Sequence, residues 1–315
     1  MTSISKEILD KYQMRKTRAQ KSAFISFLQN QYPEIILQEG GLAKNRNLIL
    51  GDVAKADILL TAHYDTCSVL PFPNFITPKN FLLYIGYVLL ILLPFFAAMA
   101  LCSAVLRIFT DDFWTHYFVT LSLYFLLLFT LLGGRPNKHT ANDNTSGVIT
   151  LCEIYAQLTD QEKQHVCIVF FDNEESGLLG SKFFQKRYKS LIGSKLLINF
   201  DCVSDGDNIL ISASKGARKK WDLQPYFTCE GDKKPLHEKA EKVFYPSDQN
   251  GFPNAVAVAA LRYNKFLGYY MSRIHTSRDT VFDERNICYL SKNTCALIAD
   301  ICNAQPSETI SQTHS

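Results

Sequence analysis

Acidic residues and histidines lie at the ends of apolar, strand-like runs of this chain, or in the turns just after them. In chain order they are His63, Asp65, Asp143, Glu174, Glu175, Asp201 and His275. Carboxylate oxygens and neutral imidazoles suit Zn²⁺ and similar divalent ions. Five such ligands, one of them a shared carboxylate, are enough to hold two metal ions side by side. The residue types therefore predict a hydrolase with two metal ions.

Two closely spaced pairs match the parts that metal-dependent peptide hydrolysis needs. Bound metal ions strengthen the nucleophilic water and stabilise the oxyanion, and a carboxylate that binds no metal must move the proton to the leaving amine. Glu174 and Glu175 are adjacent, so their side chains diverge and can divide metal binding and proton transfer between them. His63 and Asp65 lie two residues apart and share a face of a strand, so Asp65 can orient the imidazole.

Strand-like and helical segments alternate along the chain, which is typical of an α/β fold. We expect buried strands at residues 58–62, 166–171 and 196–200, and shorter strands at 35–37 and 48–49. Apolar residues at helical spacing predict helices at residues 4–31, at 148–158 and through Phe183 and Phe184. Ligands of open α/β sheets bind beyond the carboxyl ends of the strands, so the polar residues above should meet at that edge.

The order of these segments resembles that of the M28 metallopeptidases, a family that contains di-zinc aminopeptidases. The resemblance is carried by residues 62–65 (Ala-His-Tyr-Asp), 143–147 (Asp-Asn-Thr-Ser-Gly), 171–181, 199–201 (Asn-Phe-Asp), and His275-Thr276 with Asp279-Thr280. It covers nearly all of the chain except one apolar region. It implies an α/β fold with a mixed, largely parallel central sheet flanked by helices.

The resemblance also implies a role for each matching residue. His63, Asp143 and Asp201 would hold one Zn²⁺, and Asp143, Glu175 and His275 the other, with Asp143 bridging. Glu174 would be the general base, and Asp65 would orient His63. Asp248 matches a stretch of less certain role, in which Gln249 replaces the usual histidine. Thr276, Asp279 and Thr280 are expected to order the loop that carries His275.

Two long apolar stretches interrupt the soluble pattern. Residues 81–101 contain no charged residue, and residues 113–132 contain none apart from the titratable His116. Each is roughly 20 residues long, the length that a helix needs to cross a bilayer. We expect a transmembrane helical hairpin at residues 71–134, inserted into a discontinuous catalytic domain of residues 1–70 and 135–305; the alternative is a pair of buried core helices. Residues 306–315 are expected to be a disordered tail.

Charge and cysteine content indicate the compartment. The net charge of +3 is too small to indicate nucleic-acid binding, and the nine cysteines show no disulfide or zinc-site spacing, which fits a reducing compartment. The N-terminus does not have the pattern of a secretory signal peptide. Lys79, Arg135 and Lys138 flank the roots of the hairpin, so the positive-inside rule places the catalytic part on the cytoplasmic side of the membrane.

The leading functional hypothesis is a membrane-anchored aminopeptidase that removes N-terminal residues from peptides. Alternatives are a single-zinc acyltransferase like the glutaminyl cyclases, which would not need His63, an inactive membrane scaffold, and another metal-dependent hydrolase such as a carboxypeptidase or amidohydrolase. The sequence leaves open the residue preference, the oligomeric state and the choice of Zn²⁺ over Co²⁺ or Mn²⁺.

Overall fold

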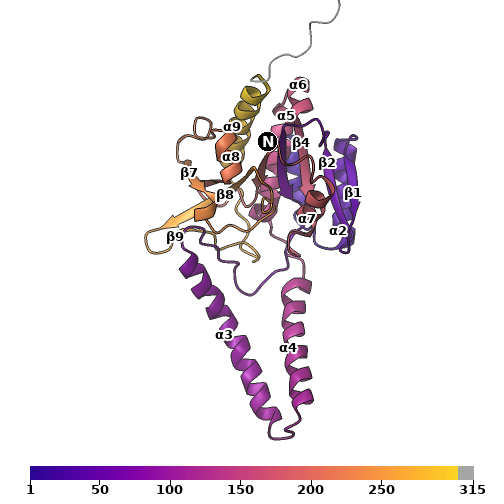
Figure 1. Ribbon diagram of the computed structural model, residues 1–315, viewed down its shortest axis with the longest axis vertical. Coiled ribbons are helices and arrows are strands. Elements are labelled where there is room, and N and C mark those ends of the chain that lie inside the picture. The colour runs from indigo at the N-terminus through magenta and orange to yellow at the C-terminus, as the bar shows by residue number, and fades with distance from the viewer. Residues whose placement is uncertain (304–315) are drawn as a thin grey trace, which may run out of the picture.

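A mixed β-sheet forms the centre of the computed structural model, which describes residues 1–303 except for the side chains of residues 130–132 (Figure 1). Its strands lie in the order β1-β2-β4-β3-β5-β8-β6-β7, and β9 pairs with β8. They are β1 (Ile36–Gly40), β2 (Asn45–Leu50), β3 (Ile58–His63), β4 (Val166–Phe171), β5 (Leu196–Phe200), β6 (Asn208–Ala213), β7 (Lys234–Lys239), β8 (Ala255–Asn264) and β9 (Gly268–Tyr270). The predicted tail at 306–315 lies outside the described residues.

The four central strands, β4, β3, β5 and β8, are parallel to one another. Every residue of β3, β4 and β5 is buried, which explains their continuous apolar runs, because a parallel sheet is covered on both faces. In the register of this sheet His63 pairs with Phe171, so the carboxyl ends of β3 and β4 are level. The predicted α/β fold with a largely parallel, mixed sheet is confirmed.

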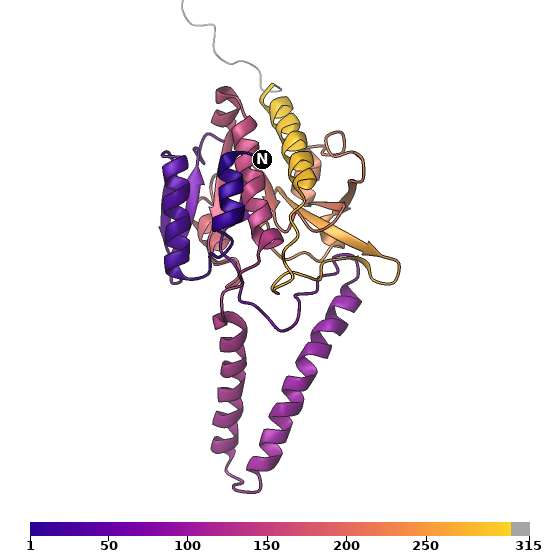
Figure 2. The same cartoon turned by 180° about the vertical axis from the view of Figure 1, so that it is seen from behind.

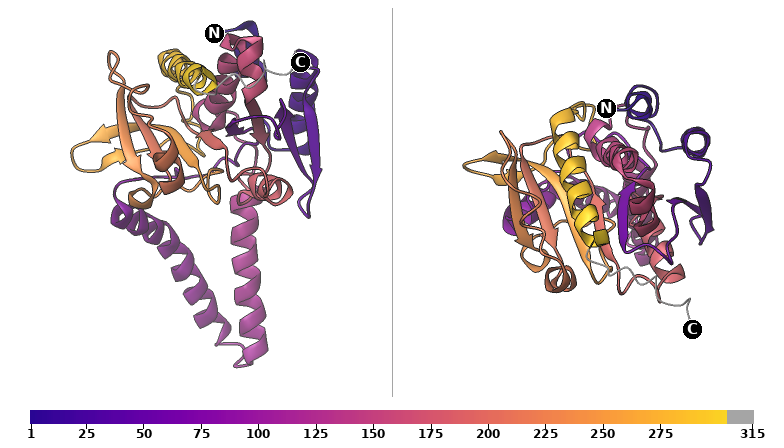
Figure 3. Two further views of the ribbon diagram at one scale, coloured as in Figure 1. Left: turned by 45° about the horizontal axis from the view of Figure 1, so that its top comes forward. Right: turned by 90° about the horizontal axis from the view of Figure 1, so that it is seen from above.

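Helices cover both faces of the sheet (Figures 2 and 3). One face packs in a single apolar core with α1 (Ser3–Lys11), α2 (Arg18–Gln31), α5 (Gly147–Gln157) and α9 (Glu284–Asn303). Ile58 and Leu60 point into that core, whereas Leu59 points into a second core with α7 (Leu179–Arg187). Alternate strand residues thus reach opposite layers. The shorter helices are α6 (Asp160–His165) and α8 (Lys215–Lys220), and Ala217 of α8 also packs in the first core.

The prediction of one helix over residues 4–31 is wrong, because the chain breaks between α1 and α2. Thr17 caps α2: its hydroxyl accepts from the Gln20 amide, and the Gln20 side chain accepts from the Thr17 amide. This capping box starts a new helix at Arg18. The break leaves residues 12–17 in an irregular segment, in which Arg15 is completely buried. The spacing of Thr17 and Gln20 could have been recognised in the sequence.

The predicted apolar hairpin forms two helices, α3 (Phe81–Leu106) and α4 (Phe113–Gly133), which project away from the sheet (Figure 1). No residue of α3, which the structure describes in full, is buried, so the alternative of buried core helices does not hold for it. Among residues 1–303, α3 is long and apolar enough to cross a membrane, whereas the apolar part of α4, Phe113–Phe129, is shorter. One such helix is weak evidence, and the two-span anchor stays a prediction.

Candidate metal centre

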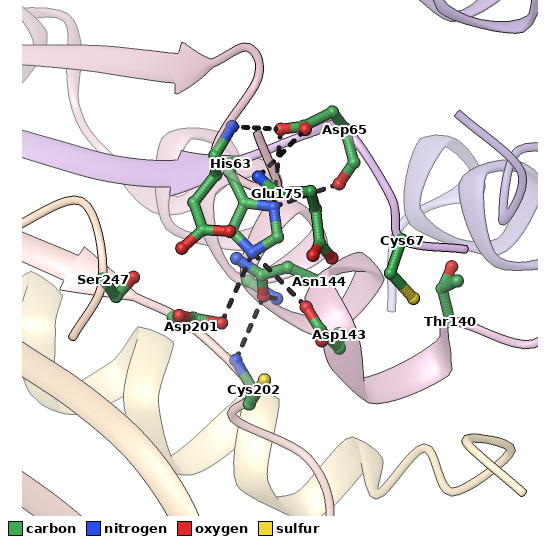
Figure 4. A network of polar contacts seen from close by, with 12 residues as sticks. His63, Asp65, Cys67, Thr140, Asp143, Asn144, Glu175, Asp201, Cys202 and Ser247 are labelled. Carbon is green, nitrogen blue, oxygen red and sulfur yellow. Dashed lines mark hydrogen bonds and ion pairs between the residues drawn. The ribbon is translucent and has the colours of Figure 1, made fainter. Parts of the chain in front are cut away.

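The ligand-bearing segments converge at the carboxyl edge of the central strands (Figure 4). His63 is the last residue of β3, Asp201 follows β5 directly, and Glu175 lies in the turn after β4. Asp143 belongs to the irregular turn Ala141–Ser146 before α5, where its φ of −109° and ψ of 96° are not helical. His275 lies in the loop between β9 and α9 with a positive φ of 62°. The structure therefore brings all five predicted ligands together.

The first group consists of His63, Asp143 and Asp201. The Nε2 atom of His63 lies 3.4 Å from Asp143 Oδ1 and 3.5 Å from Asp201 Oδ1. All three residues are buried. The imidazole thus points between two carboxylates, as a ligand of a shared cation would.

The second group contains Asp143, Glu175 and His275. The Nε2 atom of His275 lies 3.1 Å from Asp143 Oδ2 and 3.3 Å from Glu175 Oε2. The two carboxylate oxygens of Asp143 therefore face different imidazoles, one in each group. Cys67 also belongs to this second group, since its thiol lies within 4.8 Å of the ligand atoms of the other three residues. Sequence reasoning missed Cys67, which has no metal-binding motif around it.

These distances fit two divalent ions. Two oxygen or nitrogen ligands about 2.0–2.1 Å from a tetrahedral zinc ion lie roughly 3.3 Å apart, which is the spacing found in both groups. Within the described part of the chain, Glu175 Oε1 and Asp201 Oδ1 are buried without a hydrogen-bond partner. Buried polar atoms are nearly always satisfied, so these oxygens call for a cation. The described residues thus form two groups that can each hold a metal ion.

The pKa values of the ligand residues also indicate a site for cations. Burial and nearby Asp143 raise the pKa of Glu175 to about 8, although the charge of His275 opposes them. Burial lowers the pKa of His275, but the Glu175 and Asp143 carboxylates outweigh that effect and bring it to about 9. Burial likewise opposes ionisation of Asp143, yet His275 and His63 hold the pKa of this carboxyl below its usual value. The pocket therefore favours bound positive charge.

Glu174 lies beside both groups without belonging to either. Burial and the neighbouring Glu175 carboxylate raise the pKa of Glu174 well above its usual value. Its backbone is held by Asp65, whose carboxylate accepts from the Glu174 amide at 2.9 Å and from the Glu175 amide at 3.3 Å. His63 Nδ1 lies 3.0 Å from the main-chain oxygen of Asp65 and 3.7 Å from its carboxylate. Asp65 thus contacts both His63 and the glutamate turn.

Asp279 does more than order the loop of His275. Its carboxylate accepts from the amide of Asn142 at 2.9 Å and from the amide of Asp143 at 3.0 Å. Asp279 therefore fixes the turn that carries the shared carboxylate of Asp143. The two residues are 136 positions apart, and the sequence did not indicate this contact. Thr276 acts within its own loop, where its hydroxyl donates to Arg273. Gln249 accepts from Asn199 at 3.1 Å and donates to the main chain of Tyr245, so its side chain supports the loop around the fully buried Asp248.

A pocket of about 260 Å³ opens beside the second group. It is lined by Cys67, Glu175 and His275 of that group and by Asp65, and Leu70 and Phe72 line it from the segment that leads into α3. That segment is tied to the site, because the amide of Leu70 donates to the main-chain oxygen of His275 at 2.7 Å. The roots of the hairpin therefore form part of the pocket wall.

Comparisons with known proteins find matches to the sequence and to the fold. The family model described as Peptidase family M28 matches residues 128–297, more than half of the chain. Among solved structures, the LapA aminopeptidase of Legionella pneumophila is similar at a TM-score of 0.56 and 13% identity, over 96% of this chain and 68% of LapA. A glutaminyl cyclase of Porphyromonas gingivalis is similar at a TM-score of 0.55 and 15% identity, over 95% of this chain and 96% of the cyclase. No curated protein matches the sequence.

Proposed function

This chain belongs to peptidase family M28 and is a metallopeptidase of aminopeptidase-like fold, and from that premise we propose that it is a di-zinc aminopeptidase anchored in a membrane. His63, Asp143 and Asp201 would hold one ion, and Asp143, Glu175 and His275 the other. The observation that carries this proposal is the orientation of Asp143, whose two oxygens face different imidazoles at 3.4 and 3.1 Å. A single-metal site would not need a carboxylate shared in this way.

Glu174 is the general base of the proposed reaction. When bound, the two metal ions lower the pKa of water and polarise the peptide carbonyl. Glu174 takes the proton of the attacking water and later delivers it to the leaving amine, since its carboxylate belongs to neither ligand group. Asp65 keeps Glu174 in place through the backbone hydrogen bond at 2.9 Å and orients His63 from the other side.

The glutaminyl cyclase reaction is the second candidate, because the chain matches the fold of one such enzyme as well as it matches LapA. Fold similarity at these identities does not separate the two activities. The ligand set favours the peptidase, because a cyclase with one zinc ion would leave the His63 group without a purpose.

Metal analysis and a substrate panel test the proposal together. Detergent-purified protein should contain two metal ions per chain and release the first residue from aminoacyl substrates and from peptides with a free N-terminus. Cleavage of N-terminally blocked peptides alone would rule out an aminopeptidase. One metal ion per chain, with cyclisation of N-terminal glutamine in place of hydrolysis, would establish the second candidate.

The membrane anchor is the finer part of the proposal and rests on α3 and α4. The two helices lie between the segments of His63 and Asp143, which must reach one metal centre. The chain therefore has to return to the side of the membrane from which it entered. The basic residues Lys79, Arg135 and Lys138 support a cytoplasmic location of that side, by the positive-inside rule. The exposed Cys288 reports on this topology. In intact cells a membrane-impermeant maleimide should leave Cys288 unlabelled; labelling before permeabilisation would overturn the assignment.

A further inference from the structure

The irregular segment between α1 and α2, together with the first turn of α2, contacts the three segments that present His63, Asp143 and Glu174. We propose that residues 13–21, here called the N-terminal strap, complete the active site, and that Arg15 is the positioning residue that holds the His63 loop and the Asp143 turn together. This inference rests on the proposed metal centre. The strap lies outside residues 128–297, the region that the family model matches.

Arg15 joins two ligand segments that are 80 residues apart in the chain. Its Nε donates to the main-chain oxygen of Tyr64, which lies between His63 and Asp65. Its Nη1 donates to the hydroxyl of Thr145 at 3.1 Å, two residues after Asp143. The backbone amide of Arg15 adds a third bond, to the hydroxyl of Thr66 at 2.9 Å. A rigid, planar guanidinium fixes the distance between its acceptors in a way that a flexible ammonium does not.

The rest of the strap tethers the same loops from either side of Arg15. The side chain of Gln13 accepts from the amide of Thr140 at 3.1 Å, at the start of the Asp143 turn. The ammonium of Lys21 lies 2.6 Å from Asp172 Oδ1 and 2.7 Å from Asn173 Oδ1, directly before Glu174. The strap thus contacts the segments that present His63, Asp143 and Glu174.

The charge of Arg15 distinguishes it from an ordinary structural arginine. The side chain is fully buried and makes no ion pair within 4.0 Å among the residues that the structure describes. Its positive charge instead acts across the loops on Asp65 and Asp143. Burying an unpaired charge costs stability, and here the compensating negative charges are those of Asp65 and the metal ligand Asp143. A role in positioning the metal-binding loops explains why this arginine is buried here.

Cobalt substitution tests this role without relying on turnover. The visible absorption of bound Co²⁺ reports the arrangement of its ligands, so Arg15→Lys should change the cobalt spectrum and weaken metal retention. Turnover should fall by about 10–100-fold with little change in KM, the range for residues that orient metal ligands. Arg187→Lys is the matched control, because Arg187 is exposed at the end of α7 and lies outside the strap and the ligand groups, and it should behave like the unmodified protein in every assay.

Thr145→Val provides a second variant of nearly unchanged shape that removes one acceptor of Arg15. It should shift the cobalt spectrum in the same direction as Arg15→Lys, and it decides the question if Arg15→Lys does not fold. A lower melting temperature with the unmodified cobalt spectrum and metal retention, in whichever of the two variants folds, would show that the strap is merely structural. If the unmodified protein lacks peptidase activity, the proposed function fails, while the spectrum still tests the strap.

Discussion

Replacing Glu174 by glutamine should separate proton transfer from metal binding. The amide has nearly the volume of the carboxylate but does not accept a proton from water. None of the residues of the two ligand groups is altered, and the bond from the Glu174 amide to Asp65 at 2.9 Å is a backbone bond that the variant keeps. Glu174→Gln should therefore fold and retain both metal ions.

The expected loss of turnover follows from the role of Glu174 as general base. General acid–base groups contribute about 10²–10⁴-fold, which is roughly 3–5 kcal/mol of transition-state stabilisation. Turnover should fall by that factor with KM little changed. The Glu174 and Glu175 carboxylates repel each other, so removing the Glu174 charge should leave binding at the second metal position at least as tight as before.

The assay is steady-state turnover of an aminoacyl substrate alongside metal content of the same preparation. Glu175→Gln is the matched comparison, because it changes the adjacent residue in the same way and should lose metal from the second position only. Full turnover in Glu174→Gln would show that the base is another group. Loss of metal from Glu174→Gln would show that Glu174 is a ligand, which would refute the division of labour between the two glutamates.

Three further predictions concern the metal positions and their supports. Asp143→Ala should reduce metal content at both positions, whereas Asp201→Ala should reduce it at one; equal losses in metal analysis would contradict the shared carboxylate. Metal binding should release protons, because Glu175 and His275, with pKa values of about 8 and 9 in the metal-free protein, are largely protonated at pH 7 and must lose those protons to become ligands. Affinity should therefore rise as the pH increases from 6 to about 9, and calorimetry in two buffers of different ionisation enthalpy would detect no proton release if this reasoning is wrong. Asp279→Ala should lower the free energy of unfolding by about 1–3 kcal/mol and reduce metal retention, because two buried amides of the Asp143 turn lose their acceptor. Unchanged thermal unfolding would show that the turn is stable without Asp279.

Local sequence patterns were enough to predict the central strands and the ligands that follow them. β3, β4 and β5 are short apolar runs, and in a parallel sheet the residues after such runs meet at one edge. The positions of His63, Glu175 and Asp201 could thus be expected from strand order alone. Asp143 and His275 come from irregular loops, so strand order alone does not bring them to the site.

The break between α1 and α2 shows where hydrophobic periodicity misleads. Ile8, Phe24 and Leu28 all pack into the same core, so their spacing suggested one continuous helix. The capping box at Thr17 ends that continuity. Periodicity records which residues face the core, but it does not show whether the helix between them is interrupted.

By itself, the sequence determined the kind of chemistry, the α/β class and the strand ends at which the polar residues lie, because each depends on residues close together in the chain. Only the tertiary structure decided that the two oxygens of Asp143 face different histidines, that Asp279 holds the turn of Asp143, and that Arg15 joins two ligand loops. Those contacts join residues 49 to 136 positions apart, and their geometry depends on how the layers pack, which leaves no periodic pattern in the sequence.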